Sequence, residues 1–130
     1  MIAFDTNLLV RLAVNDDQHQ ADIAEQLINN NNVFISRTVL LESEWVLRSV
    51  YKTSRNDIAA FFGNVLITEN ITVENTTEVE QAFEWYKLGA DFADALHLCI
   101  CGESLMHTFD GQFCKAASKS GLTPAFKVLK

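Results

Sequence analysis

The stretch LGADFADALHLCIC, residues 88–101, decides how the rest of the chain is interpreted. After Gly89 it is apolar on nearly every side, which predicts a helix buried inside a domain. Two carboxylates nevertheless stand in its first turn. Asp91 and Asp94 are three residues apart, so they project from the same side of the helix. Asp94 has no Lys or Arg three or four positions away, and Asp91 has only Lys87, which lies beyond the break predicted at Gly89.

Burying an unpaired carboxylate is costly, so this pair needs a partner. A divalent cation is the simplest candidate. Asp91 alone is equally well explained as the N-cap of the helix, and Asp94 is favoured by the positive end of the helix dipole. For the pair together, on so apolar a helix, we favour a functional site.

The composition is that of an ordinary globular protein. The chain has 130 residues, 48% of them hydrophobic, with a single proline, and we expect one domain over residues 1–130. No apolar run approaches the roughly 20 residues of a membrane span, and no signal-peptide pattern follows Met1, so we expect a cytoplasmic protein. Cys99, Cys101 and Cys114 are odd in number and lack CxxC spacing, which favours reduced thiols.

The net charge of −7 is unfavourable for a partner made of phosphates. The total misleads, however, if several acids surround metal ions whose own charge the count leaves out.

Short apolar runs alternate with helical patterns along the whole chain. Strands alternating with helices predict a parallel sheet covered by helices on both faces, a three-layer α/β/α architecture with four to five strands. Strands are expected at residues 2–4, 33–35, 71–73, 105–109 and 126–129, and helices over about 8–12, 18–29, 38–51, 55–66, 77–88, 91–101 and 113–121.

Two further acids follow strands directly. Asp5 ends the first strand and Asp110 the fourth, and the carboxyl ends of parallel strands share one edge of a sheet, where ligands bind. Each has a plainer explanation, since Asp5 is placed to cap a helix and Asp110-Gly111 is a turn dipeptide. Their convergence with Asp91 and Asp94 carries the argument.

Two glutamates in the helix 38–51 are predicted to differ. Glu44 has Arg48 four residues later, the favourable order for a surface ion pair. Glu42 has apolar neighbours at most of its i±3 and i±4 positions, so we expect it on the buried face without a cation beside it. A buried acid of this kind is a candidate ligand or base, and a hydrogen-bonded structural glutamate is the alternative.

Oxygen ligands without a Cys or His cluster suit Mg²⁺ or Mn²⁺ rather than zinc. A carboxylate-bound dication supports in-line displacement at phosphorus by activating a bound water. No GxxxxGK[ST] loop is present, so metal-assisted phosphodiester hydrolysis is the reaction class that the residues favour.

Four segments, residues 1–11, 40–47, 91–97 and 108–113, together resemble the PIN domain, and in particular the VapC toxins of bacterial toxin–antitoxin pairs. The motifs stand in family order over nearly the whole chain. The resemblance implies an Mg²⁺- or Mn²⁺-dependent endoribonuclease that is homodimeric and is held inactive by a VapB-like antitoxin.

The resemblance also implies roles for single residues. The catalytic and metal-binding acids would be Asp5, Glu42, Asp94 and Asp110, with Asp91 as an additional acid. Asn7 and Thr108 match the family's supporting polar residues. Arg11 and Arg37 are the basic residues that we expect to contact RNA, although a basic side chain on a helix is usually only solvated. His97 lies one turn after Asp94, and we expect it to be packed and hydrogen-bonded rather than catalytic.

Two other functions remain open. The first is a catalytically silent binding or regulatory module of the same fold. The second is a phosphatase or receiver-like α/β protein with Asp5 as phosphoacceptor, which is disfavoured because residues 5–7 lack a second Asp two positions after Asp5.

Overall fold

The computed structural model describes the backbone of residues 1–114 and 126–130. The chain divides into two compact units, Met1–Thr76 and Thr77–Lys130, and each is described by itself. A single domain over residues 1–130 therefore stays a prediction.

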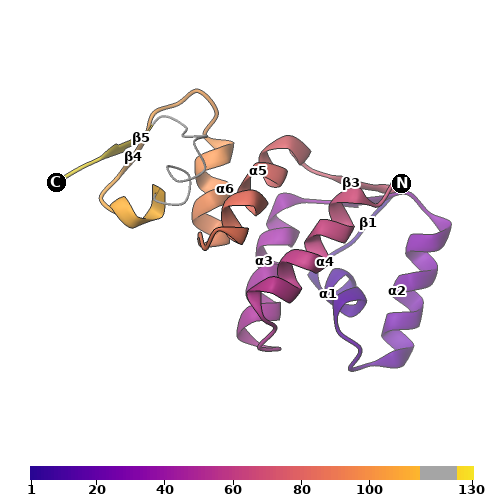
Figure 1. The fold of residues 1–130 in the computed structure, drawn as a ribbon. Coiled ribbons are helices and arrows are strands. Elements are labelled where there is room, and N and C mark those ends of the chain that lie inside the picture. The colour runs from indigo at the N-terminus through magenta and orange to yellow at the C-terminus, as the bar shows by residue number, and fades with distance from the viewer. Residues whose placement is uncertain (115–125) are drawn as a thin grey trace. The chain divides into compact units, whose positions relative to one another are not determined.

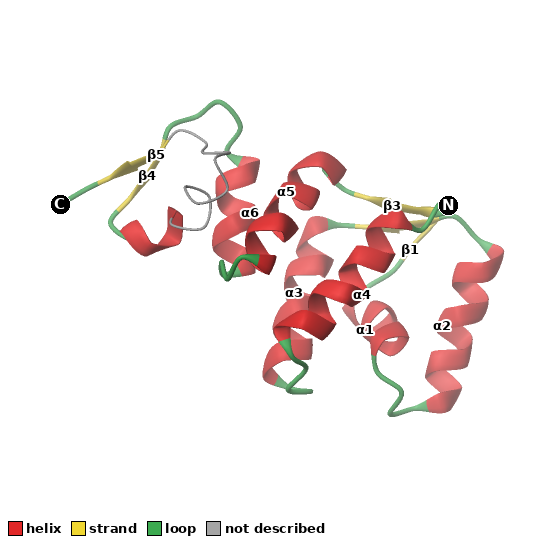
Figure 2. Cartoon of the chain, in the orientation of Figure 1, coloured by secondary structure: helices red, strands yellow, loops and turns green. Residues whose placement is uncertain are grey.

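The first unit is built on a parallel sheet of three short strands (Figure 2). They are β1 (Ile2–Ala3), β2 (Val33–Ile35) and β3 (Ile71–Val73), hydrogen-bonded in the order β1-β2-β3. Ile2 pairs with Val33, and Val33 with Ile71, so the strands run in register. Their carboxyl ends consequently share one edge. The prediction that the strand before Asp110 shares this edge with the strand before Asp5 is wrong for the described residues, because that strand, β4 (Met106–Thr108), belongs to a second sheet.

The helices of this unit are α1 (Thr6–Ala13), α2 (Gln18–Asn30), α3 (Arg37–Ser49) and α4 (Arg55–Ile67). Each begins at a short polar residue whose side chain accepts a backbone N–H of the first turn. These N-caps are Asp5, Asp17, Ser36 and Ser54. Side chains of this type satisfy amides that the helix itself leaves unpaired, which is why the helices start at these residues.

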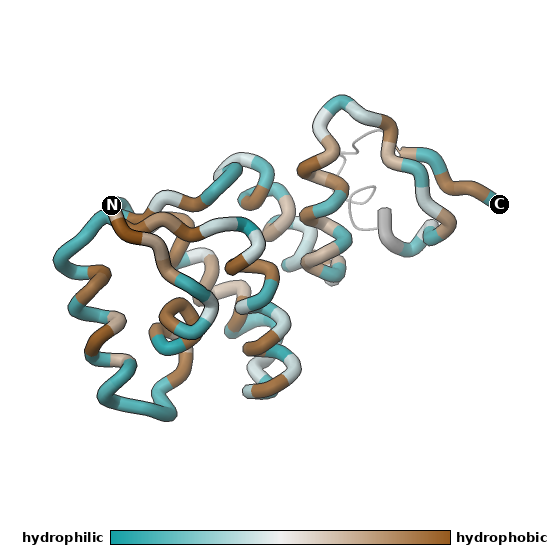
Figure 3. The backbone as a smooth tube through the Cα atoms, turned by 180° about the vertical axis from the view of Figure 1, so that it is seen from behind, coloured by the Kyte–Doolittle hydropathy of each residue, from teal (hydrophilic) through white to brown (hydrophobic). Residues whose placement is uncertain are grey.

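The four helices lie on the same side of the three strands in Figure 1. Right-handed crossovers between strands in the order β1-β2-β3 place their connections on one face of the sheet. Apolar side chains of both layers, such as Leu9, Val33, Leu40 and Phe62, are completely buried. In Figure 3 the hydropathy along α2 changes repeatedly between hydrophilic and hydrophobic, as in a helix with one buried face. The second helical layer stays a prediction.

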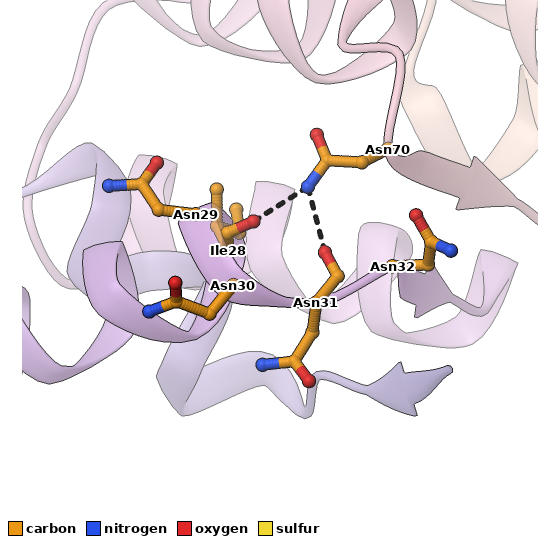
Figure 4. Close-up of a pocket in the computed structure, with 6 residues that line it drawn as sticks. All are labelled: Ile28, Asn29, Asn30, Asn31, Asn32 and Asn70. Carbon is orange, nitrogen blue, oxygen red and sulfur yellow. Dashed lines mark hydrogen bonds between the residues drawn. The ribbon is translucent and has the colours of Figure 1, made fainter.

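Asn70 makes hydrogen bonds to α2 and β2 at the edge of the sheet where the strands begin. Asn70, just before β3, donates through Nδ2 to the carbonyl oxygens of Ile28 (2.6 Å) and Asn31 (2.8 Å), and its own carbonyl accepts the N–H of Val33 (2.9 Å). The end of α2 is thereby held to both β2 and β3. With Asn29, Asn30 and Asn32 these residues line a polar pocket, in which the four asparagines before β2 point in different directions (Figure 4).

The second unit contains α5 (Thr76–Lys87), whose first residue closes the first unit, and α6 (Phe92–Ile100). Between them the chain turns at Gly89, whose φ of +108° favours glycine. Phe92 stacks on Phe83 with ring centroids 4.5 Å apart and meets Tyr86 edge-on at 5.9 Å. These aromatic contacts pack the start of α6 against α5.

After α6 come β4 (Met106–Thr108), a 3₁₀ turn at Gly111–Cys114, and β5 (Phe126–Val128). β4 and β5 pair in parallel, Met106 opposite Phe126. The predicted α/β class is confirmed. The predicted single sheet of four or five strands is wrong for the described residues, because hydrogen bonds join three strands in one sheet and two in another.

The helix predicted over residues 113–121 is observed only as the 3₁₀ turn in its first two positions, and residues 115–121 lie outside the described part of the chain. Among the described helices, none has the length and hydrophobicity required to cross a bilayer.

We predict that Asn70→Asp destabilises the protein by about 1–3 kcal/mol, because a carboxylate cannot donate to the two carbonyl oxygens that Asn70 now satisfies. Urea denaturation measures the loss. Asn29→Asp is the control, since Asn29 is exposed and lies in the same pocket. Equal effects of the two substitutions would show that the charge, and not the lost donor, is responsible.

Candidate functional site

Asp5 lies between β1 and α1, directly before the first residue of α1. Its backbone is extended, and its Oδ1 accepts the N–H of Leu8 at 3.0 Å, so Asp5 is the N-cap of α1. The side chain is exposed. The cap uses only one carboxylate oxygen, so capping is compatible with a ligand on Oδ2. The N-cap explanation of Asp5 is therefore confirmed, and its role as a metal ligand stays a prediction.

Glu42 is exposed, which corrects the prediction that it lies on the buried face of its helix. The residues that α3 buries are Leu40, Ser43, Glu44 and Leu47. Their spacing of three and four residues is that of one helix face, and Glu42 lies beside it. Trp45, which the sequence counted among the apolar neighbours of Glu42, is 54% exposed.

The buried acid of α3 is Glu44, only 3% exposed. Its Oε2 accepts from Nε of Arg48 at 2.9 Å. The predicted Glu44–Arg48 pair is confirmed, but its description as a surface pair is wrong for the glutamate, because Glu44 belongs to the buried stripe.

The hydroxyl of Thr6 donates to Oε1 of Glu42. Thr6 directly follows Asp5 in the chain, so this bond joins the turn after β1 to α3, and α1 and α3 pack against each other. The sequence reasoning did not select Thr6. Its only signal was its place between Asp5 and Asn7, because the partner lies 36 positions away.

In the second unit Asp91 is the N-cap of α6, and its Oδ1 accepts the N–H of Asp94 at 3.0 Å. Asp94 is half-buried in the first turn. Burial raises the pKa of the Asp94 carboxyl, the charges of Asp91 and Asp110 raise it further, and His97 opposes them. Asp94 is thus near enough to Asp91 and Asp110 for their charges to affect its ionisation.

Asp110 stands in the turn after β4. Its backbone N–H donates to Oγ1 of Thr108 (3.0 Å), and its Oδ1 accepts the N–H of Gln112 (3.0 Å). The following 3₁₀ turn packs against α6, which begins at Asp91 and carries Asp94. The hydroxyl that the sequence placed beside Asp110 therefore helps to fix the turn that holds this acid.

His97 is exposed, so the prediction of a packed histidine is wrong. The buried residues of α6 are Phe92, Ala95, Leu96 and Leu98. His97 lies on the opposite side of the helix, where its side chain reaches solvent. Cys99 and Cys101 are free, as predicted, and burial raises the pKa of the Cys99 thiol to about 12. That thiol is protonated near neutral pH and is no nucleophile.

The two arginines selected for RNA have protein partners. Arg11 donates to Asp16 and, at 3.1 Å, to the hydroxyl of Tyr51, and hydrogen bonding to Asp16 raises the pKa of Arg11. Arg37 donates to Asn75 and lies 3.9 Å from Oε2 of Glu74. Asn7 is exposed. These contacts give both arginines a structural role whatever else they bind.

The donor atoms suit a hard dication, because the acids offer only oxygen. Burial, and then the charges of Asp91 and Asp110, raise the pKa of Asp94, and a bound cation would offset these two charges. Within residues 1–114 and 126–130, however, no three Asp, Glu, His or Cys side chains form a group able to hold a metal ion. The convergence of Asp5 and Glu42 with Asp91, Asp94 and Asp110 stays a prediction.

The model of the PIN domain family matches residues 2–119. The chain belongs to the PIN domain family. Among solved structures, VapC20 of Mycobacterium tuberculosis, a Sarcin-Ricin loop cleaving toxin, is similar at 24% identity, with 96% of this chain and 98% of that chain covered and a TM-score of 0.43. A comparison with curated proteins finds no match.

The burial of the Asp94 carboxyl, together with the charges of Asp91 and Asp110, predicts a specific dependence of stability on pH. Because the pKa of Asp94 is higher in the folded state than its ordinary value, ionising Asp94 costs folding free energy, and this cost is present above the folded pKa and vanishes at low pH. Asp94→Asn should therefore stabilise the metal-free protein near pH 7, and the gain should shrink as the pH falls toward about 4.

Thermal denaturation in EDTA from pH 3.5 to 8 measures this difference, with exposed Glu103→Gln as the control. A gain that does not change with pH would contradict the assignment.

Proposed function

We propose that this PIN domain is an Mg²⁺- or Mn²⁺-dependent endoribonuclease that acts as the toxin of a toxin–antitoxin pair. The supporting observation is that the chain belongs to the PIN family. Of the acids expected from the resemblance, Asp5 caps α1 directly after β1, Asp94 lies in the first turn of α6, and Asp110 lies in the turn after β4. Asp5, Glu42, Asp94 and Asp110 would be the catalytic and metal-binding quartet, and Asp91 an additional ligand.

A bound dication would supply a nucleophilic water and offset negative charge at phosphorus. Local hydrogen bonds of the chain orient the acids proposed to hold the metal. Capping of α1 holds Asp5, the Thr108 hydroxyl fixes the turn of Asp110, and the Asp91 cap fixes the first turn that carries Asp94. Asn7, exposed beside Asp5, is the further polar group proposed to support the site.

The RNA would be held by contacts that overcome a net charge of −7. Arg11 and Arg37 remain the proposed contacts, although both also serve the fold. Because phosphate contacts release counterions, RNA affinity should fall steeply as salt increases. The biological partners proposed with this function are a VapB-like antitoxin and a second copy of the chain, in the cytoplasm.

We predict that the purified protein cleaves RNA when Mg²⁺ or Mn²⁺ is added and stops when EDTA is added. Asp5→Asn and Asp94→Asn should lower the rate at least about a hundredfold, because an amide is a weaker ligand for a hard dication than a carboxylate. Asn also caps a helix well, so Asp5→Asn should stay folded.

Single-turnover cleavage of a labelled RNA, with circular dichroism of each variant, is the measurement. Asp22→Asn, an exposed acid on α2, is the matched control. If the site variants cleave RNA as fast as the Asp22 control, the proposed mechanism is wrong.

A catalytically silent binding module is the second candidate. It is favoured by the local hydrogen bonds of Asp5, Asp91 and Asp110, which give each acid a structural explanation without a metal. Calorimetry with Mn²⁺ separates the two functions. Binding that Asp94→Asn abolishes supports the nuclease, and absence of both binding and cleavage supports the module.

A further inference from the structure

We propose that Thr6 is a positioning residue that holds Glu42 in the orientation needed for metal binding, an inference that rests on the proposed nuclease function. The observation is the hydrogen bond from the Thr6 hydroxyl to Oε1 of Glu42, within the first unit. Among the hydrogen bonds of residues 1–114 and 126–130, this is the one that joins an acid proposed for the site to the side chain of a residue distant in the sequence.

Glu42 is exposed, so its side chain needs a hydrogen-bond partner to stay in one orientation. Glu42 lies on the exposed side of α3, outside the stripe that buries Leu40, Ser43, Glu44 and Leu47. An exposed glutamate samples many rotamers, and ordering it costs up to about 2 kcal/mol. The side-chain hydroxyl of Thr6, the first residue of α1, restricts those rotamers before any metal binds.

The bond also couples two acids. Thr6 is the first residue of α1, and Asp5 is the N-cap of the same helix. The backbone that positions Asp5 is therefore the backbone that positions the Thr6 hydroxyl, and the hydroxyl in turn positions Glu42. Because Oε1 accepts the Thr6 hydroxyl, Oε2 of Glu42 would be the oxygen left free for a metal ion.

The packing of α1 on α3 supports this coupling. Leu9 and Val10 of α1 and Leu40 and Leu47 of α3 are buried. The distance between the Thr6 backbone and the Glu42 backbone is consequently set by the core. A hydroxyl group at position 6 can donate a hydrogen bond to Oε1 of Glu42 across this distance, and a methyl group cannot.

The decisive comparison is Thr6→Val against Thr6→Ser. Valine keeps the shape but removes the donor, whereas serine keeps the donor. We expect Thr6→Val to weaken Mn²⁺ binding about 10- to 100-fold, the usual effect of removing a group that orients a ligand, and Thr6→Ser to bind nearly as wild type. Calorimetry with Mn²⁺ alone, without RNA, is the primary measurement.

Cleavage kinetics provide a second readout. The loss in Thr6→Val should appear in kcat, with little change in the KM for RNA, because Thr6 does not touch the substrate. In a Glu42→Gln background the same substitution should have no further effect on Mn²⁺ affinity. Thr72→Val, an exposed threonine of β3 in the same unit, is the matched control.

Thermal denaturation of the metal-free variants identifies a purely structural role. If Thr6→Val lowers stability but leaves Mn²⁺ affinity and kcat at the wild-type values, the inference is overturned while the proposed function stands. If the wild type neither binds Mn²⁺ nor cleaves RNA, both fail. Should Thr6→Val not fold, Thr6→Ala replaces it, with the same expected loss of affinity.

Discussion

The parallel pairing of β1, β2 and β3 is the constraint on which the first unit depends. Because all three strands run in one direction, a crossover connection must lead from each strand to the next, and here it contains helices. The chain therefore leaves every strand by a turn at the same edge of the sheet. Asp5 and Ser36 occupy the first two of these turns and cap the helices that follow. The opposite edge, where strands begin, is fastened by the amide of Asn70.

Capping and ligand binding are compatible at the same residue. A carboxylate at a helix N-terminus satisfies a backbone N–H with one oxygen and leaves the other available, and the helix dipole favours its negative charge. Asp5 and Asp91 both have this arrangement. The cap restricts the side chain of the acid, and this structural role is compatible with the proposed function.

The two glutamates of α3 point to different sides of the helix, and their burial is the reverse of the prediction: Glu44 is buried and Glu42 is exposed. Both have apolar neighbours in the sequence, but only Glu44 lies in line with Leu40 and Leu47. Buried Glu44 is paired with the exposed side chain of Arg48, whereas exposed Glu42 accepts a hydrogen bond from the Thr6 hydroxyl of another helix. The exposed acid is the one that remains accessible to a metal or a substrate.

The sequence alone determined the α/β class, most element boundaries, the breaks and caps, and the family, because these depend on local pattern, on residues such as Ser54 and Gly89, and on the order of short motifs. It also identified the Thr108 hydroxyl beside Asp110, since the two are close in the chain. Only the tertiary structure decided that Glu42 is exposed, that His97 reaches solvent, that the strands form two separate sheets, and that Thr6 contacts Glu42. Each of these depends on which side of an element meets a distant one, and packing between residues far apart in the sequence sets that choice.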